Sequence, residues 1–417
     1  QTSEWVRLRY GSPEDVGINS EDLVQIDEIC NSGIADKAFP GCEVVVLKDG
    51  SMIYQESFGY HTYEKKREVR NDDIYDLASI TKIAASTLSL MYLQDNGNIR
   101  LDYRLCDYIS EMVDTTPYQN MVLRDMLSHQ AGLVSWIPFY KKTLIKGMPR
   151  FDIYSQAESE LYGQRVAEDF YIKTDYSDEI IRRILGTPLK TPGRYKYSDL
   201  GYYLIQKIIE KEVQMPLDSF VSKTFYLPMG LNTMGYKPRN RFELDRIAPT
   251  EYDMLFRKQL VHGDVHDPGS AMLGGVGGHA GVFSSAEDLA KLMQMYINGG
   301  TYGGIRYISD STVAEFTDCQ NCTGEEGENR RGAGFDKPVR FGVGGPTCQC
   351  ISFDSFGHSG FTGTLAWGDP DEDLVYIFLS NRVYPDADNR KLIQTGYRTQ
   401  IMKVIYEAVA NSKDLVQ

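Results

Sequence analysis

Runs of apolar and β-branched residues mark strands near both ends of this 417-residue chain. Residues 43–59 (EVVVLKDGSMIYQESFG) contain two such runs joined by an Asp-Gly dipeptide, which is typical of a tight hairpin. Residues 362–370 and 373–381 contain two more runs, joined by an Asp-Pro-Asp turn. The pattern predicts a mainly antiparallel sheet built from both termini.

Between these strands, apolar positions recur at the three- and four-residue intervals of a helix. The clearest segments are residues 79–95, 200–213 and 286–300, and a further helix at 390–409 is expected to close the chain. We therefore predict an α/β (α+β) fold, in which helices flank the sheet and a mostly helical lobe is inserted into it.

No internal repeat, low-complexity tract or linker separates independent domains. We therefore expect one catalytic domain over residues 1–417. Its sheet subdomain is expected at about residues 1–75 and 335–417, and its helical subdomain at about residues 76–334. A cleft would lie where the two meet.

Composition narrows the classes of function. The chain is 42% apolar and 24% charged, as in ordinary globular proteins, and its net charge is -14. A nucleic-acid partner is disfavoured, because phosphate binding needs clustered Lys and Arg. No apolar run approaches the ~20 residues that span a bilayer, so we expect no membrane span. The N-terminal residues lack the pattern of a signal peptide, which fits a mature secreted protein whose leader is absent from the given chain.

The seven cysteines leave at least one unpaired within the chain. Cys319, Cys322, Cys348 and Cys350 read C-x-x-C and C-x-C, within a long excursion at residues 318–350 that we expect to be exposed. Four thiolates could bind zinc, but the irregular spacing favours disulfides or simple thiols. We predict neither a metal nor a cofactor.

Ser79 and Lys82 introduce the first candidate chemistry. A serine hydroxyl needs a base to become a nucleophile, and a lysine three residues later shares its helix face. No other serine in the chain has a lysine at this spacing. The alternative is that Ser79 only caps the apolar helix that it opens.

Two later stretches place polar residues at turns. Residues 191–205 (TPGRYKYSDLGYYLI) put Tyr197 and Asp199 before a predicted helix, and residues 356–367 (FGHSGFTGTLAW) put His-Ser-Gly before a predicted strand. Taken in order, the three motifs resemble those of the serine β-lactamase and penicillin-binding-protein superfamily. The resemblance is to its class C-like branch, which includes D-amino-acid peptidases and esterases. It covers nearly the whole chain, including MLSHQAGL at 126–133.

The resemblance implies catalysis through an acyl-enzyme. Ser79 would attack a carbonyl group, and Lys82 and Tyr197 would share the proton transfers. The backbone N–H groups of Ser79 and Phe361 would form the oxyanion hole, in which each donor is typically worth ~3 kcal/mol.

The third motif would contribute to substrate binding through His358, Ser359 and Gly360, next to Phe361. In this interpretation His358 helps to bind a substrate carboxylate. Such an anchor should weaken as the pH rises past ~6.5, where an ordinary histidine loses its charge.

Asp199 departs from the family's second motif, Tyr-x-Asn, which ends in an amide. Reading the motif one residue later, as Ser198-Asp199-Leu200, does not supply the amide either. No amide is then present to donate a hydrogen bond to a substrate acylamino carbonyl. An ionised Asp199 near Lys82 would also favour the ammonium form and weaken Lys82 as a base. We therefore expect Asp199 to shape a substrate site that favours something other than a typical β-lactam.

Other arrangements fit less well. His262 and His266 have the spacing of a zinc helix, but Gly and Pro around them indicate a loop. The glycine-rich residues 266–281 lack the strand and the Lys-Ser/Thr of a phosphate loop, so we expect a tight structural loop. His129 is expected to brace a turn.

The sequence therefore predicts a serine hydrolase that acts on a small ester, an amide or a peptide containing a D-amino acid. The resemblance further suggests a cell-wall-derived substrate and a bacterial periplasmic or secreted location. An alternative of another class is a ligand-binding or sensor module that keeps the pocket but turns over slowly or not at all. A zinc-stabilised interaction protein is a weaker alternative.

Overall fold

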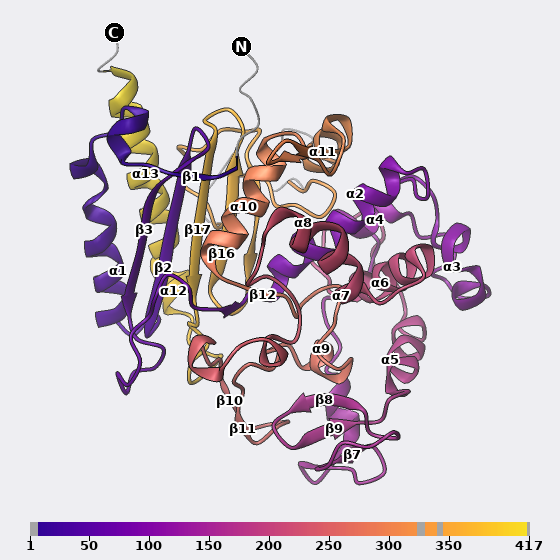
Figure 1. Ribbon diagram of the computed structural model, residues 1–417. Coiled ribbons are helices and arrows are strands. Elements are labelled where there is room, and N and C mark those ends of the chain that lie inside the picture. The colour runs from indigo at the N-terminus through magenta and orange to yellow at the C-terminus, as the bar shows by residue number, and fades with distance from the viewer. Residues whose placement is uncertain (1–6, 323–329, 340–344, 415–417) are drawn as a thin grey trace.

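A computed structural model describes residues 7–322, 330–339 and 345–414 (Figure 1). Its main sheet has six strands in the order β1-β3-β2-β17-β16-β15. All neighbouring pairs are antiparallel except β1 and β3, so strands from the two ends of the chain meet at β2 and β17, as predicted. The strands are β1 (Arg9–Tyr10), β2 (Gly41–Lys48), β3 (Ser51–Gly59), β15 (Phe356–Gly360), β16 (Thr364–Asp369) and β17 (Leu374–Ser380).

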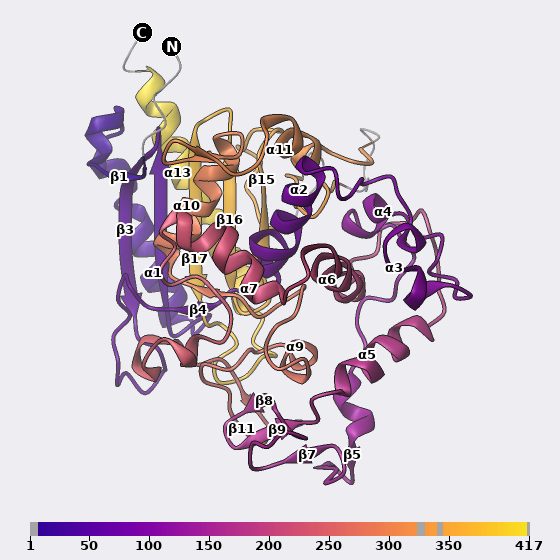
Figure 2. The same cartoon turned by 45° about the vertical axis from the view of Figure 1, so that its right-hand side comes forward.

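Helices cover both faces of this sheet (Figures 1 and 2). Successive residues of β2 point to opposite faces. Val44 and Val46 join the apolar core under α1 (Gln25–Ala35), α12 (Lys391–Thr395) and α13 (Tyr397–Asp414). Val45 and Leu47 join the larger core that includes α10 (Ala286–Ile297). Because both faces are buried, β2 reads as a continuous apolar run.

The lobe beside the sheet is mostly helical (Figure 2). Within the range expected for this lobe, α10 packs on the sheet, against β2, β16 and β17. The lobe also holds a small sheet in the order β7-β9-β8, which the apolar pattern did not reveal. Its helices are α2 (Thr87–Asp95), α3 (Leu105–Val113), α4 (Leu123–Leu127), α5 (Tyr176–Leu185), α6 (Leu200–Val213), α7 (Leu217–Val221), α8 (Leu227–Met229), α9 (Pro268–Met272) and α11 (Asp310–Thr317). Its short strands are β4 (Tyr75–Asp76), β5 (Leu144–Ile145), β6 (Met148–Pro149), β7 (Tyr154–Ser155), β8 (Gln164–Ala167), β9 (Phe170–Ile172), β10 (Tyr252–Asp253), β11 (Gln259–Leu260), β12 (Phe283–Ser284), β13 (Thr301–Tyr302) and β14 (Ile305–Arg306).

Three local expectations need correction. The segment expected to be one helix from residue 79 begins as a 3-10 turn and a π-helical turn, Lys82–Ser86, before α2. The C-terminal helix is broken at Gly396, whose φ of 69° is left-handed, so α12 and α13 are separate. The His-Ser-Gly triplet lies inside edge strand β15 and not before a strand, because the chain turns only after Gly360.

The late cysteines form two local disulfides, Cys319–Cys322 and Cys348–Cys350. Cys30, Cys42 and Cys106 are free. Within the described ranges, no group of three or more His, Cys, Asp or Glu residues could hold a metal. The acidic part of the excursion, residues 323–329, lies outside the described residues. Among the described helices, none is both long and apolar enough to cross a bilayer.

Candidate active site

Ser79 lies on a strained turn that follows β4. Ala78, just before it, has a φ of 47°, a left-handed value that costs energy for a residue with a side chain. The turn is held because the Ala78 N–H donates to the Asp76 carboxylate at 2.8 Å and the Leu77 N–H donates to the Val282 carbonyl at 3.0 Å. Such strain persists only where the surrounding structure enforces it, as at functional sites.

Two side chains converge on Ser79 Oγ. Lys82 Nζ lies 3.0 Å from Ser79 Oγ, and the Tyr197 hydroxyl donates to the same oxygen at 2.9 Å. Lys82 is fully buried, and its ammonium lies 5.1 Å from the centre of the Tyr197 ring. The structure therefore brings together the three residues that the sequence predicted to be catalytic, from positions 118 residues apart.

The Lys82 ammonium has an acceptor for each of its three protons. Besides Ser79 Oγ, these are Asp199 Oδ1 at 2.7 Å and the His279 carbonyl at 3.2 Å. Burial alone would lower the pKa of Lys82, but the neighbouring Asp199 and Tyr197 oxygens outweigh burial and raise it. At neutral pH Lys82 is therefore a fixed cation and a poor proton acceptor.

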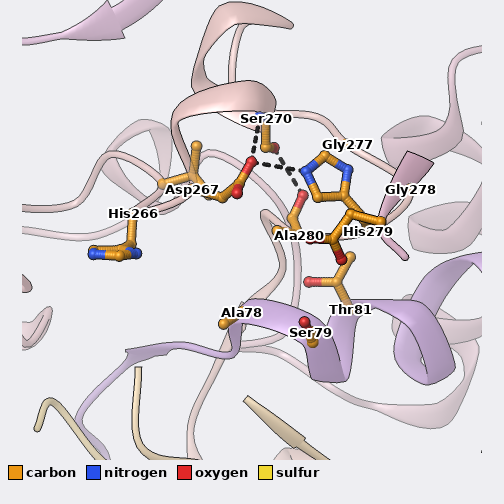
Figure 3. Close-up of polar contacts among 12 residues, drawn as sticks. Ala78, Ser79, Thr81, His266, Asp267, Ser270, Gly277, Gly278, His279 and Ala280 are labelled. Carbon is orange, nitrogen blue, oxygen red and sulfur yellow. Dashed lines mark hydrogen bonds and ion pairs between the residues drawn. The ribbon is translucent and has the colours of Figure 1, made fainter. Parts of the chain in front are cut away.

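The His279 carbonyl belongs to a tightly held loop above Ser79 (Figure 3). The His279 ring pairs with the Asp267 carboxylate at 2.7 Å, and Ser270 Oγ donates to the Ala280 carbonyl at 2.8 Å. From below, Thr81 Oγ1 accepts from the Val282 N–H at 3.1 Å. The glycine-rich segment is thus a structural loop, as predicted, but it also supplies a ligand to Lys82.

The turn that carries Tyr197 is braced by the segment after α4. The Ser198 N–H donates to His129 Nδ1 at 3.2 Å, and Ser198 Oγ donates to the Val134 carbonyl at 2.7 Å. The Asp199 N–H donates to the Ser135 carbonyl at 3.1 Å. Burial, together with nearby cations, lowers the pKa of His129 well below its usual value, so the ring is neutral. This agrees with the predicted bracing role of His129.

His358 is not placed as an ordinary cationic anchor. Its side chain is 2% exposed, and Nδ1 lies 2.8 Å from the Ser359 carbonyl. Burial, more than any neighbouring charge, lowers the pKa of His358 to about 4. Because the His358 ring is already neutral at pH 6.5, the structure does not support the expectation that its binding of a substrate carboxylate weakens as the pH rises past that value.

The turn after β15 is fixed against the backbone that precedes Ser79. Thr362 Oγ1 donates to the Asp76 carbonyl at 2.7 Å, and Thr364 Oγ1 donates to the Leu77 carbonyl at 3.2 Å. A Cβ at Gly360 would collide with Thr364 Oγ1 and the Leu77 carbonyl, so only glycine allows this close approach. These contacts fix the turn that carries Phe361 against the backbone that precedes Ser79.

The Phe361 ring is half-exposed and contacts the His266 ring and the Arg382 guanidinium. The His266 ring stacks with it at a centroid distance of 5.5 Å, and the Arg382 guanidinium carbon lies 4.6 Å from its centroid. The sequence did not predict that His266, Arg382, His279 and Arg331 contribute to this site, because none of them belongs to a short motif.

The fold and this arrangement define the class of active-site serine hydrolases. A family profile described as Beta-lactamase matches residues 26–396, and the chain belongs to that family. A protein of Salmonella agona (strain SL483) with the name "Putative D-alanyl-D-alanine carboxypeptidase" is 31% identical, over 93% of this chain and 89% of the relative.

Solved structures show the same fold at lower identity. The D-amino acid amidase from Ochrobactrum anthropi SV3 superposes with a TM-score of 0.66 at 17% identity, covering 94% of this chain and 99% of that one. EstCE1, described as a hydrolase with promiscuous acyltransferase activity, has a TM-score of 0.66 at 18% identity, covering 93% and 99%. The predicted fold class is confirmed.

Proposed function

We propose that this hydrolase works through an acyl-enzyme on Ser79, with Tyr197 as the proton acceptor and Lys82 as a fixed cation. The observation that carries the proposal is the convergence of the Tyr197 hydroxyl and Lys82 Nζ on Ser79 Oγ, at 2.9 and 3.0 Å. Because Asp199 holds Lys82 as the ammonium, Tyr197 is the contact of Ser79 that is left to take its proton.

The reaction follows from these positions. Tyr197 first gives up its hydroxyl proton to solvent. The ionised oxygen then takes the Ser79 proton while Oγ bonds to the substrate carbonyl carbon, and the Ser79 and Phe361 N–H groups stabilise the resulting oxyanion. Collapse breaks the bond to the leaving group, which receives the proton from Tyr197. Water then attacks the acyl-enzyme with Tyr197 again as base, and the acyl group leaves as a carboxylic acid while Ser79 regains its proton. Burial raises the pKa of Tyr197, and the positive charge of Lys82 opposes that rise and so stabilises the ionised form.

The proposed substrates are small esters, amides or peptides containing a D-amino acid. The names of the relative from Salmonella and of the amidase with the same fold support this range. Asp199, which accepts from Lys82 Nζ at 2.7 Å, is a carboxylate at the position where the family's second motif has an amide, and this favours substrates other than typical β-lactams. A cell-wall-derived substrate and a bacterial periplasmic or secreted location remain part of the proposal, as does the absence of a nucleic-acid partner.

Intact-mass analysis after treatment with a fluorophosphonate, and separately with penicillin, tests the proposal. We expect a single fluorophosphonate adduct that is lost in Ser79→Ala and retained in Ser159→Ala, an exposed serine of the lobe. Equal labelling of Ser79→Ala would exclude Ser79 as the nucleophile. A stoichiometric penicillin adduct on Ser79 would keep the mechanism but overturn the inference from Asp199.

The buried Lys82–Asp199 pair also favours a second candidate, a ligand-binding module with little or no turnover, because it weakens the nearest amine as a base. Absence of labelling by either reagent, in a protein that melts cooperatively, would favour this candidate.

A further inference from the structure

Arg331 is a second cation beside Tyr197, and it comes from the segment after α11. Its guanidinium carbon lies 5.2 Å from the centre of the Tyr197 ring, and Nη2 donates to the Tyr195 hydroxyl at 3.2 Å. The side chain is buried, with 7% exposed. A full positive charge at this distance in a buried site favours the ionised form of a tyrosine.

Arg331 is fixed by its surroundings. It forms an ion pair of 2.5 Å with Asp336, whose N–H donates to the Gly357 carbonyl of β15 at 2.8 Å. The Arg331 carbonyl accepts from the Gln320 N–H at 2.8 Å, between the two cysteines of the first disulfide. The Arg331 guanidinium is buried and already paired with Asp336. It is therefore better suited to act as a fixed charge than to bind a substrate carboxylate.

Lys82 is the other cation among the described groups that face Tyr197. Lys82 is positive but is paired with Asp199, which opposes ionisation of Tyr197. The ring of His129 lies 4.4 Å away and that of His358 lies 6.2 Å away, measured between centroids. Burial lowers the pKa of both histidines, so both rings are neutral at pH 7.

We propose that Arg331 is a positioning residue that stabilises ionised Tyr197. The inference rests on the proposed function, because it acts through the proton transfer from Ser79 to Tyr197. Arg331 belongs to the excursion at residues 318–350. This excursion would then have an electrostatic role, although it contributes no residue to the three family motifs.

The test is the pH profile of fluorophosphonate labelling, followed as a rate by intact mass in the full chain. Arg331→Gln should raise the pKa that governs labelling by about one unit, so that the rate falls about tenfold at pH 7 and recovers at higher pH. Arg331→Lys keeps the charge and should retain the wild-type profile. Arg194→Gln, an exposed arginine in the same turn as Tyr195, is the matched control and should change nothing.

Thermal melting shows whether each variant is folded, and Arg331→Met replaces Arg331→Gln if the glutamine variant fails to fold. A slow, pH-independent loss shared by Arg331→Gln and Arg331→Lys would show a merely structural role and overturn the inference. A further drop on adding Arg331→Gln to Tyr197→Phe would overturn it too, because the effect must pass through Tyr197. Failure of wild type to label at Ser79 would instead refute the proposed function.

Discussion

Removal of the carboxylate at residue 199 should expose how strongly Lys82 is held as a cation. Lys82 Nζ and Asp199 Oδ1 are 2.7 Å apart, with the Lys82 side chain 0% and the Asp199 side chain 19% exposed. Two unit charges about 4 Å apart attract by ~4 kcal/mol at an effective dielectric constant of ~20. Removing one partner of a buried pair typically costs ~3 to 5 kcal/mol. Since Asp199 is partly exposed, we expect Asp199→Asn to lose about 3 kcal/mol of stability at pH 7.

The loss should depend on pH in a defined direction. In wild type the pKa of Lys82 is raised above the unfolded value of ~10.4, so the stabilisation is complete below that pH and is lost above the folded pKa. In Asp199→Asn burial would lower the pKa of Lys82, and the variant would regain stability as the pH rises toward ~10. The difference between the two proteins should therefore be largest near pH 7 and narrow toward pH 10.

Thermal melting followed by circular dichroism from pH 6 to 10 measures this difference. A loss of about 3 kcal/mol corresponds to roughly 3 to 4 °C in a chain of this size. Glu111→Gln is the matched control, because Glu111 and Lys211 form an exposed pair of 2.9 Å that should contribute less than ~1 kcal/mol. Lys82→Met combined with Asp199→Asn should recover part of the loss. Equal melting of wild type and Asp199→Asn at pH 7, or a gap that widens toward pH 10, would refute the reasoning.

Four further outcomes follow from the site. Tyr197→Phe should slow fluorophosphonate labelling at least about 100-fold while melting within a few degrees of wild type, and near-normal labelling would remove Tyr197 as the base. Gly360→Ala should reduce labelling by a similar factor, because its Cβ meets the Leu77 carbonyl and displaces the turn that carries Phe361; a crystal structure with an unmoved turn would contradict this. For an anionic substrate, the contribution of His358 to KM should be the same at pH 5.5 and pH 8, since its pKa is lowered to about 4; a KM difference between wild type and His358→Gln that changes with a midpoint near 6.5 would show that the histidine is charged in use. Because the folded pKa of His358 lies below the unfolded value of ~6.5, the protein should also lose stability as the pH falls from ~6.5 toward 4, and less so in His358→Gln.

Local patterns in the sequence predicted the strands β2, β3, β16 and β17 of the main sheet, but not β1 or β15. The Asp-Gly turn between β2 and β3 and the long apolar runs of β2 and β17 follow from backbone preferences and from burial on both faces. Helix α6 was predicted with both of its ends, because a turn precedes it and its apolar residues repeat at helical spacing. The π-helical turn after Ser79 was not predictable in this way, since local propensity favours an ordinary helix there.

The sequence by itself determined the family, and it predicted the candidate serine, lysine and tyrosine of the active site, because these rest on short motifs in a fixed order. Only the tertiary structure decided the protonation of the site. Burial, and charges from segments more than 100 residues apart, decide whether Lys82 is held as a cation, whether His358 is neutral and whether Arg331 faces Tyr197. Electrostatic energies vary with separation and solvent exposure, and neither quantity can be read from residue order alone.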